Sequence, residues 1–337
     1  MNKFYIYHHT DDDGYGSAAV VILYLLHQHK IQSWDSEQVE LIPYCYEPNN
    51  NFLPHRNYQE NDEIYVVDLS VSSATLSKFK DFLDTLKLNK SKLIWVDHHK
   101  SSQDVLDDTS NNIKTILESY SFTYLVNTSY CGMYNCWNLL FENSPIPEIV
   151  RLIDDWDCWK HKLKDTKAFH YGLDSTSYYL PTNDMWKQYL TNRGYCLQFI
   201  KDRVTEGNAI LNFIEQDNSL KYRNHFDCEL FGFNCCCLNA TRNSDIFIEF
   251  DKYDVVLAFM FNGDIYKYSI YSPKNSSAFC NIIAEYFGGG GHKGASGFTS
   301  KKLVVSKKST LIYKCKELIR KFHYNKIMKK GSDKNVN

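Results

Sequence analysis

The sequence lacks the long apolar runs and paired cysteines that would place it in a membrane or a disulfide framework. No stretch of its 337 residues reaches the roughly 20 consecutive apolar residues that a membrane-spanning helix needs. The N-terminus has too short an apolar run before its charges to be a secretory signal. The eleven cysteines are odd in number, include no CxxC pair and cluster only at Cys235–Cys237. We therefore expect reduced thiols, no membrane association and a cytoplasmic location.

The charge of the chain is nearly balanced overall but unevenly distributed. The net charge is −2, yet residues 301–337 hold twelve Lys or Arg against Glu317 and Asp333, a local charge of +10 that leaves −12 on residues 1–300. An acidic body is suited to bound divalent cations, and the basic tail could contact an anionic substrate such as nucleic acid. A solvated terminus explains the tail equally well.

The first half of the chain alternates short apolar strands with amphipathic helices. Strands are expected within 3–9, 39–47, 63–70 and 92–99, and helices within 16–30 and 72–86, the latter opening on a Ser cap. Two of these strands, IYVVDL and LIWVD, are apolar on both faces, as expected of strands covered on both sides by helices. This alternation predicts an α/β fold whose N-terminal sheet is mostly parallel, with helices on both faces.

The second half changes from helical to strand patterns. A long helix is predicted at 184–216, followed by a strand within 228–240 and a hairpin at Asn262-Gly263. A helix within 276–287, a glycine run, a strand and a last helix complete a smaller α/β module. The predicted organisation is a first domain at 1–183, a helical linker at 184–216, a second domain at 217–325, and a basic, disordered tail at 326–337.

The stretch HHTDDDGYGSA, residues 8–18, concentrates imidazoles and carboxylates just before a predicted helix. His9, Asp11 and Asp13 are spaced two apart, so in an extended segment their side chains point the same way. We expect Gly14 and Gly16 to let the chain turn sharply into the helix. Three such groups on one side lose solvation or repel one another unless a cation neutralises them.

Two further strands end in residues of the same kind. Asp68 follows the third predicted strand, and Asp97, His98 and His99 end the fourth. Residues just past the carboxyl ends of parallel strands share one crevice, so these groups should meet the N-terminal cluster. A fourth acidic cluster, LIDDWDCW, ends a predicted helix; its acids are either surface groups or the source of a last carboxylate.

Mixed carboxylate and imidazole donors without thiolate favour manganese or magnesium over structural zinc. Six such groups exceed the needs of one ion and suit a pair of ions about 3.5–4 Å apart, the arrangement that hydrolyses phosphate esters. The sequence therefore predicts a two-metal phosphoryl hydrolase.

Five stretches, taken in order, resemble the motifs of one family. HTDDDGYGSA, VVDLS, VDHH and DDWDCW resemble the four motifs of the DHH phosphoesterase superfamily. FGGGGHKGASGF resembles the glycine-rich signature of the first type of DHH-associated C-terminal domain. The resemblance covers about residues 3–300, and implies a DHH catalytic domain at 1–183 and a DHH-associated substrate-binding domain at 217–325.

The resemblance implies a role for each residue that matches a motif. Two divalent ions are implied, with manganese as the first candidate and magnesium or cobalt as alternatives. Asp68 would bridge them, Asp13 would serve the second ion with it, His99 would face the scissile phosphate, and Asp97 would orient the histidines. The implied metal ligands are His9, Asp11, Asp13, Asp68, His98 and Asp157.

The register of the fourth motif selects Asp157, with Asp154 as second choice and Asp155 facing solvent. In the C-terminal signature the backbone of the glycine run would closely approach an anion, and a histidine would bond a phosphate oxygen. These implied substrate-binding residues are Gly289, Gly290, Gly291 and His292.

The chain departs from the family pattern in two places. His8 precedes His9, and the spacing to the aspartates favours His9 as the ligand. Tyr271 stands where many relatives carry Arg before the glycine run, which suggests stacking on a base in place of a charge contact.

Among family members, the chain resembles the nanoRNase-type proteins. That likeness implies hydrolysis of short single-stranded RNA or DNA oligonucleotides to nucleoside 5′-monophosphates. Two alternatives stay open: a phosphodiesterase for cyclic or linear dinucleotides or cyclic mononucleotides, and a non-catalytic nucleotide-binding sensor. The oligomeric state is also open, with a homodimer among the options.

Overall fold

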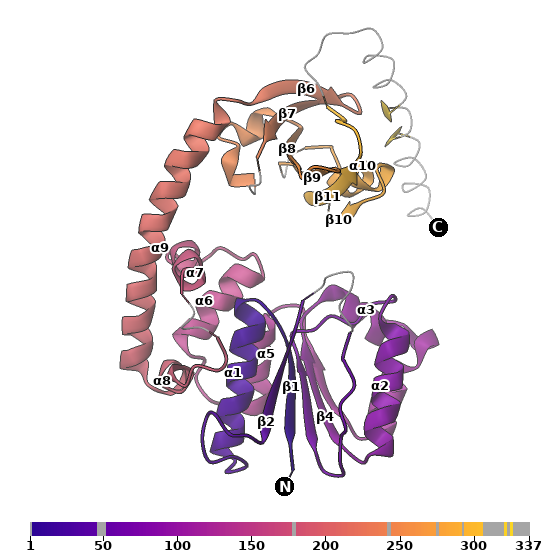
Figure 1. Ribbon diagram of the computed structural model, residues 1–337, viewed down its shortest axis with the longest axis vertical. Coiled ribbons are helices and arrows are strands. Elements are labelled where there is room, and N and C mark those ends of the chain that lie inside the picture. The colour runs from indigo at the N-terminus through magenta and orange to yellow at the C-terminus, as the bar shows by residue number, and fades with distance from the viewer. Residues whose placement is uncertain are drawn as a thin grey trace. The chain divides into compact units, whose positions relative to one another are not determined.

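The computed structural model describes residues 2–45, 52–176, 180–240, 244–273, 276–291, 293–305, 320–321 and 324–325. The chain divides into two compact units, Met1–Leu211 and Asn212–Asn337 (Figure 1). The predicted basic tail, most of the last predicted helix and His292 lie outside the described residues.

In its described part, the first unit contains a five-stranded sheet in the order β2-β1-β3-β4-β5, with every neighbouring pair parallel. Its strands are β1 (Phe4–His9), β2 (Val39–Tyr44), β3 (Glu63–Val67), β4 (Lys92–Asp97) and β5 (Thr123–Val126). Its helices are α1 (Asp12–His27), α2 (Leu76–Leu88), α3 (Lys100–Asp107), α4 (Ile113–Ser119), α5 (Gly132–Leu140), α6 (Glu148–Asp157), α7 (Thr166–Asp174) and α8 (Met185–Thr191), with a 3₁₀ turn η1 (Thr109–Asn111).

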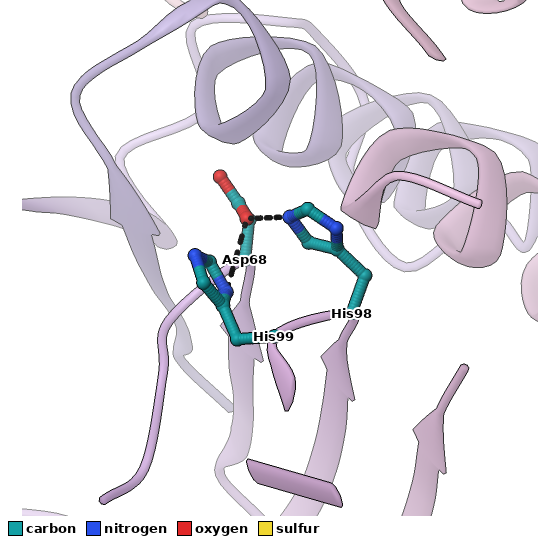
Figure 2. Close-up of side chains that lie close together, drawn as sticks. All are labelled: Asp68, His98 and His99. Atoms are coloured by element: carbon teal, nitrogen blue, oxygen red, sulfur yellow. Dashed lines mark ion pairs between the residues drawn. The ribbon is translucent and has the colours of Figure 1, made fainter. Parts of the chain in front are cut away.

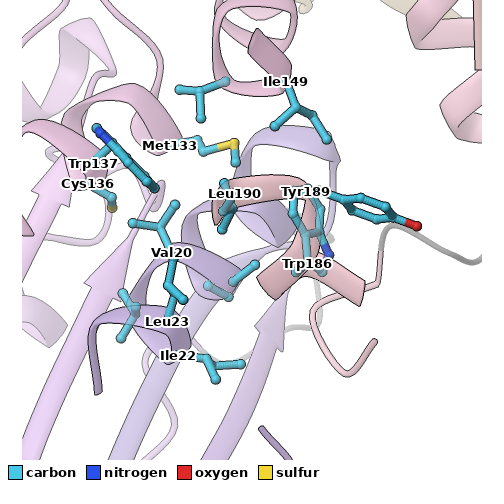
Figure 3. Close-up of a cluster of buried hydrophobic side chains, with 14 of the residues drawn as sticks. Val20, Ile22, Leu23, Met133, Cys136, Trp137, Ile149, Trp186, Tyr189 and Leu190 are labelled. Atoms are coloured by element: carbon cyan, nitrogen blue, oxygen red, sulfur yellow. The ribbon is translucent and has the colours of Figure 1, made fainter. Parts of the chain in front are cut away.

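Alternate residues of the strands enter two separate cores, because successive side chains point to opposite faces of a sheet. Phe4 and Ile6 pack with α1, α5 and α8 on one face, in the cluster shown in Figure 3. Tyr5 and Tyr7 pack with α2 and α4 on the other face. The predicted parallel sheet with helices on both faces is therefore confirmed.

The helix predicted at 184–216 is two helices, α8 and α9 (Arg193–Tyr222). Asn192 lies between them in an extended conformation, with φ −114° and ψ 103°. Its Oδ1 accepts hydrogen bonds from the backbone N–H groups of Gly194 (3.1 Å) and Tyr195 (3.3 Å) at the start of α9. An asparagine that caps the following helix thus divides the apolar pattern that predicted a single helix. Helix α9 continues from the first unit into the second.

In its described part, the second unit contains a mixed sheet in the order β10-β11-β9-β8-β7-β6. Its elements are β6 (Phe226–Leu230), β7 (Phe233–Asn239), β8 (Val255–Phe261), β9 (Tyr266–Tyr271), α10 (Cys280–Tyr286), β10 (Gly290–Gly291) and β11 (Ala295–Ser300), with 3₁₀ turns η2 (Ser244–Ile246) and η3 (Phe250–Lys252). A long helix leading into a smaller C-terminal α/β module agrees with the predicted fold class.

One predicted strand of this unit is wrong. The stretch 228–240 is the greater part of an antiparallel hairpin, β6 and β7, which turns at Phe231 (φ 58°) and Gly232 (φ 83°). The predicted Asn262-Gly263 hairpin is confirmed between β8 and β9, where Asn262 Oδ1 accepts from the backbone N–H groups of Asp264 (3.2 Å) and Ile265 (3.0 Å). An Asn-Gly pair between apolar runs predicts a hairpin turn, whereas a Phe-Gly pair inside an apolar run does not.

No helix in the described ranges is both long enough and apolar enough to span a bilayer. The cysteines of the Cys235–Cys237 cluster behave as strand residues: Cys235 and Cys237 enter one core, and Cys236 enters the other. All three are buried, which fits a packing role for this cluster.

Candidate metal centre

The ends of three neighbouring parallel strands bring the first ionisable groups together. His9 is the last residue of β1, Asp68 directly follows β3, and Asp97 is the last residue of β4. Because β1, β3 and β4 are adjacent and parallel, their carboxyl ends lie at one edge of the sheet. The convergence predicted from the sequence for these strand ends is observed.

Asp68 lies at the centre of this group. Its side chain is buried (1% exposed), and its backbone adopts a positive φ of 54°, which is uncommon for a residue with a side chain. Asp68 Oδ1 is 3.2 Å from His98 Nε2 and 3.9 Å from His99 Nδ1, and Figure 2 shows both imidazoles converging on this carboxylate. Asp68 Oδ2 is 3.8 Å from His9 Nδ1.

The N-terminal cluster reaches the site by a different route from the one predicted. Helix α1 begins at Asp12, so Asp13 lies in its first turn and not in an extended segment. Asp11 is the N-cap, whose Oδ1 accepts from the backbone N–H of Gly14 at 2.9 Å while Oδ2 contacts His9 Nδ1 at 2.6 Å. The predicted turn at Gly14 is also wrong: a Cβ there would lie 2.3 Å from the carbonyl oxygen of His9, so glycine lets the first turn of α1 pack closely against the end of β1.

Asp13 is anchored by the start of α5, a contact that the sequence did not predict. Its two carboxylate oxygens accept from the backbone N–H groups of Gly132 and Met133, each at 2.6 Å. A Cβ on Gly132 would lie 2.8 Å from the Cβ of Asp68, so only glycine fits between the two aspartates. The sequence predicted no role for Gly132, which is the first residue of α5.

Asp97 contacts the second of the two histidines that follow β4. Asp97 is fully buried, and its Oδ1 contacts His99 Nδ1 at 2.8 Å. This contact lowers the pKa of Asp97 against the effect of burial, which raises it. Asp97 therefore acts on the site through His99, whose imidazole it orients.

The three aspartates at the end of α6 have three different partners. Asp157 Oδ2 is 3.4 Å from His98 Nε2, within the cluster. Asp154 instead contacts Lys160 Nζ at 2.6 Å and accepts from the backbone N–H of Cys131 at 2.9 Å. The expectation that Asp155 faces solvent is wrong: it is 3% exposed and accepts from the N–H groups of Lys162 and Leu163 and from Thr166 Oγ1.

The electrostatics of the cluster favour a cation. Burial raises the pKa of Asp68 well above its ordinary value, and the charges of Asp13 and Asp11 raise it further. Burial and the charge of Asp13 raise the pKa of Asp157 to about 7. Burial alone lowers the pKa of His98, but contact with Cys158 and the nearby carboxylates raise it to about 10.

Several buried carboxylate oxygens of the cluster lack hydrogen-bond partners, which bears on whether the cluster suits metal ions. Among the described residues, both carboxylate oxygens of Asp68, Oδ2 of Asp97 and Oδ2 of Asp157 are buried without a hydrogen bond of good geometry. Buried oxygens in that state are costly unless another group neutralises them. Two groups of closely spaced donor atoms, His9/Asp11/Asp68 and Asp68/His98/His99, share Asp68, so the residues present fit a pair of ions with one common carboxylate.

Further ionisable groups border the centre and were not predicted. His170 of α7 contacts Asp12 (Nδ1–Oδ2, 2.7 Å) and Asp174 (Nε2–Oδ2, 3.4 Å). A cavity of about 260 Å³ adjoins them and is lined by Thr10, Asp11, Asp12, Asp13, Ile153, Trp156, Asp157, His170 and Asp174. Cys158 lies beside His98 and Asp157, with donor atoms within 4.8 Å of one another. No strand end announces His170, which explains why the sequence did not single it out.

The predicted glycine run lies in the second unit. Gly290 and Gly291 form β10, which pairs with β11, and a Cβ on Gly290 would meet open space. A Cβ on Gly289 would lie 2.1 Å from the carbonyl oxygen of Gly297, so this glycine serves close packing. Tyr271 ends β9, opposite Ala295 of β11. The anion-binding role of this run stays a prediction.

A buried carboxylate and imidazole cluster at the carboxyl edge of a parallel sheet defines a candidate metal centre. Residues 3–150 of the chain match the DHH family, N-terminal domain. Over these residues the chain is similar to the DHH family. The matched range includes His9, Asp68 and His98, whereas Asp157 lies just beyond it.

The chain is also similar to individual proteins. Uncharacterized protein R106 of Acanthamoeba polyphaga mimivirus is 24% identical over 313 residues, 87% of this chain and 66% of that protein, so the chain spans just under two thirds of its length. The DHH domain of PF0399, a member of a family of ribosomal proteins, covers 97% of this chain and 86% of its own, with a TM-score of 0.52 and 12% identity. The pGpG-specific phosphodiesterase PggH of Vibrio cholerae covers 89% of this chain and 94% of its own, with a TM-score of 0.44 and 12% identity.

Proposed function

We propose that the protein is a metal-dependent phosphodiesterase that hydrolyses short single-stranded oligonucleotides to nucleoside 5′-monophosphates in the cytoplasm. One observation carries the proposal: the carboxylate of Asp68 is buried among imidazoles and carboxylates, and neither of its oxygens has a hydrogen-bond partner of good geometry in the described residues. A divalent cation is the group that such a carboxylate suits.

The ligands divide into two sets that share Asp68. His9 and Asp11 would hold one ion with Asp68, and Asp13, His98 and Asp157 would hold the other. Manganese is the first candidate because the donors are carboxylates and imidazoles, with magnesium or cobalt as alternatives. A pair of divalent ions supplies an activated water and stabilises the charge that develops during phosphodiester hydrolysis.

The residues of the chain itself supply positioning. Asp97 fixes the orientation of His99 through the 2.8 Å contact, so that the opposite nitrogen of the ring can donate to a nonbridging phosphate oxygen. The backbone N–H groups of Gly132 and Met133 hold Asp13 in one orientation. In the second unit, Gly289 to Gly291 and His292 would anchor one end of the oligonucleotide.

Product analysis tests this proposal. Protein freed of metal by chelation is supplied with manganese, magnesium or cobalt and given a labelled RNA pentamer, linear and cyclic dinucleotides, and cyclic mononucleotides. Release of nucleoside 5′-monophosphates from the pentamer is expected. Cleavage confined to dinucleotides or cyclic mononucleotides would show that these, and not oligonucleotides, are the substrates. Absence of any cleavage would contradict the proposed hydrolysis and favour a nucleotide-binding sensor.

A further inference from the structure

One tryptophan differs from the others in this protein. Four of the six tryptophans are buried (Trp34, Trp95, Trp137 and Trp186) and Trp156 is half-buried, but Trp159 is 70% exposed. Its backbone is also in the left-handed region, with φ 54°. A bulky residue is uncommon in that conformation, which costs of the order of 1–3 kcal/mol unless the surrounding structure enforces it. The chain therefore presents a large aromatic ring to solvent at an energetic cost.

Hydrogen bonds to Asp155 fix the loop that carries Trp159. The backbone N–H groups of Lys160 and His161 donate to the carbonyl oxygen of Asp155 at 3.0 and 3.1 Å. The carboxylate of the same residue accepts from the N–H groups of Lys162 and Leu163. A buried acid thus fixes both the start and the middle of the loop, and the exposed ring is placed by hydrogen bonds.

Trp159 belongs to an aromatic cluster. Its ring centroid is 4.5 Å from that of His161 and 5.7 Å from that of Trp156. On another side Trp156 stacks on His170, with centroids 4.0 Å apart and the ring planes 18° from parallel. The cluster therefore extends from an exposed ring at the surface to rings that are packed against α7.

This cluster borders the candidate metal centre. Trp156 lines the cavity that Asp11, Asp13 and Asp157 also line, and Trp156 directly precedes Asp157 in α6. A phosphodiester held at that centre carries nucleosides on both sides. A base on the Trp156 side of that phosphodiester would lie next to this cluster.

Resting on the proposed function, we infer that Trp159, supported by Trp156 and His161, is a stacking surface for a nucleobase of the oligonucleotide. Aromatic side chains bind single-stranded nucleic acid through stacking, which tolerates every base because each has a π-face. Carboxylates line the neighbouring cavity and repel free phosphate, so the surface favours the uncharged base of a nucleotide whose phosphate lies at the metal centre.

The test compares Trp159→Ala and Trp159→Phe with Tyr195→Ala, a matched control in which another exposed aromatic of the same unit, on α9, is removed. Two RNA pentamers are used in parallel with the intact one, each lacking the base on one side of the scissile bond. Trp159→Ala is expected to raise KM for the intact pentamer about tenfold with kcat unchanged, and to leave KM unchanged for the pentamer that lacks the stacked base. Trp159→Phe should keep most of the affinity.

Binding is measured separately from turnover, by fluorescence anisotropy of manganese-loaded protein with a labelled pentamer whose linkages cannot be hydrolysed. A loss of affinity of about tenfold in Trp159→Ala and none in Tyr195→Ala supports the stacking surface. Equal affinity of Trp159→Ala and the unaltered protein overturns it even if the pentamer is cleaved. Absence of pentamer cleavage, with the Trp159-dependent binding retained, overturns the proposed hydrolysis alone; absence of both cleavage and binding overturns both.

Discussion

The two ends of strand β3 each carry a buried carboxylate, and the protein surrounds them in opposite ways. At the amino end, Glu63 is 5% exposed and contacts Lys30 Nζ at 2.7 Å and Lys92 Nζ at 3.4 Å, while Tyr65 donates to it at 2.9 Å. At the carboxyl end, Asp68 is 1% exposed, and described carboxylates and imidazoles surround it without a lysine or arginine contact.

The pKa values of the two groups diverge accordingly. Burial raises the pKa of Glu63, but the hydrogen bond and charge of Lys30 bring it below the ordinary value. Burial and neighbouring carboxylates raise the pKa of Asp68 instead. Lysines of the chain pair with one carboxylate, whereas the other lies among carboxylates and imidazoles, the donors that a divalent cation takes. Burial of an acid alone therefore does not mark a site; a buried acid among other carboxylates and imidazoles, in place of lysine, is the better indicator.

The largest expected effect comes from removing the charge at the carboxyl end. Asp68→Asn should lower hydrolysis more than about a hundredfold, because residues that only support metal ligands already contribute about 10–100-fold. The metal-free variant should be at least as stable as the unaltered protein, since a buried like charge is lost. Activity assays and urea unfolding measure the two effects. Full activity in Asp68→Asn would contradict the assignment of Asp68 as a metal ligand.

Helix α6 also carries one aspartate assigned to the metal centre, Asp157, and one that holds a loop, Asp155, so the two roles can be compared within one helix. Asp157→Asn should lower activity by about 10–100-fold, as for a residue that holds a metal or its ligands, with little change in the free energy of unfolding. Asp155→Asn should instead cost about 1–3 kcal/mol of stability, because it weakens three hydrogen bonds to a buried acid. Urea unfolding and activity per folded molecule separate the two variants. Equal effects of both on activity would contradict the assignment of Asp157.

Metal addition should stabilise the protein through the carboxyl end of β3 alone. At manganese a hundredfold above its Kd, the free energy of unfolding should rise by about 2.7 kcal/mol for each ion bound, and Asp68→Asn should lose most of this gain. Because the pKa of Asp157 is raised to about 7 in the metal-free protein, the ion competes with a proton below that pH. Apparent affinity should therefore increase as pH rises from 6 to 8, measured by calorimetry. A pH-independent affinity would point to other ligands.

The smallest expected effect is at the amino end. Glu63→Gln should cost about 1–2 kcal/mol of stability at neutral pH and leave hydrolysis unchanged; Lys30 and Lys92 are partly exposed, which limits the cost. Since the folded-state pKa of Glu63 lies below the ordinary 4.5, its contribution is present above that pH and is lost as pH falls through and below it. In urea unfolding between pH 6 and pH 3, the free energies of unfolding of the unaltered protein and of Glu63→Gln should therefore become more similar as the pH falls. A constant difference over that range would contradict the role of the charge.

The strand ends of the candidate site were predictable from the sequence because parallel strands align their carboxyl ends. His9, Asp68 and the group from Asp97 to His99 follow from that rule alone. Asp13 was identified for a wrong reason: a spacing of two predicted an extended segment, but the N-cap at Asp11 starts the helix earlier, and helical geometry carries Asp13 inward.

Long-range partners were not predictable from sequence pattern. Asp154, Asp155 and Asp157 are chemically alike, and the partner of each depends on where the 159–166 loop, the start of α5 and the end of β4 lie. The same limit applies to Gly132, whose role depends on the approach of Asp13 and Asp68, and to His170, which reaches Asp12 across 158 positions of the chain. Elements with strong local signals, such as the Asn262-Gly263 hairpin, were correctly predicted, whereas the Phe231-Gly232 turn has no such signal.

Anomalous diffraction from crystals of the full chain grown with manganese tests the central claim most directly. Two manganese peaks about 3.5–4 Å apart are predicted, with the carboxylate of Asp68 between them and imidazole nitrogens of His9 and His98 in contact. Peaks elsewhere, or a carboxylate of Asp68 that contacts no manganese in those crystals, would contradict the account.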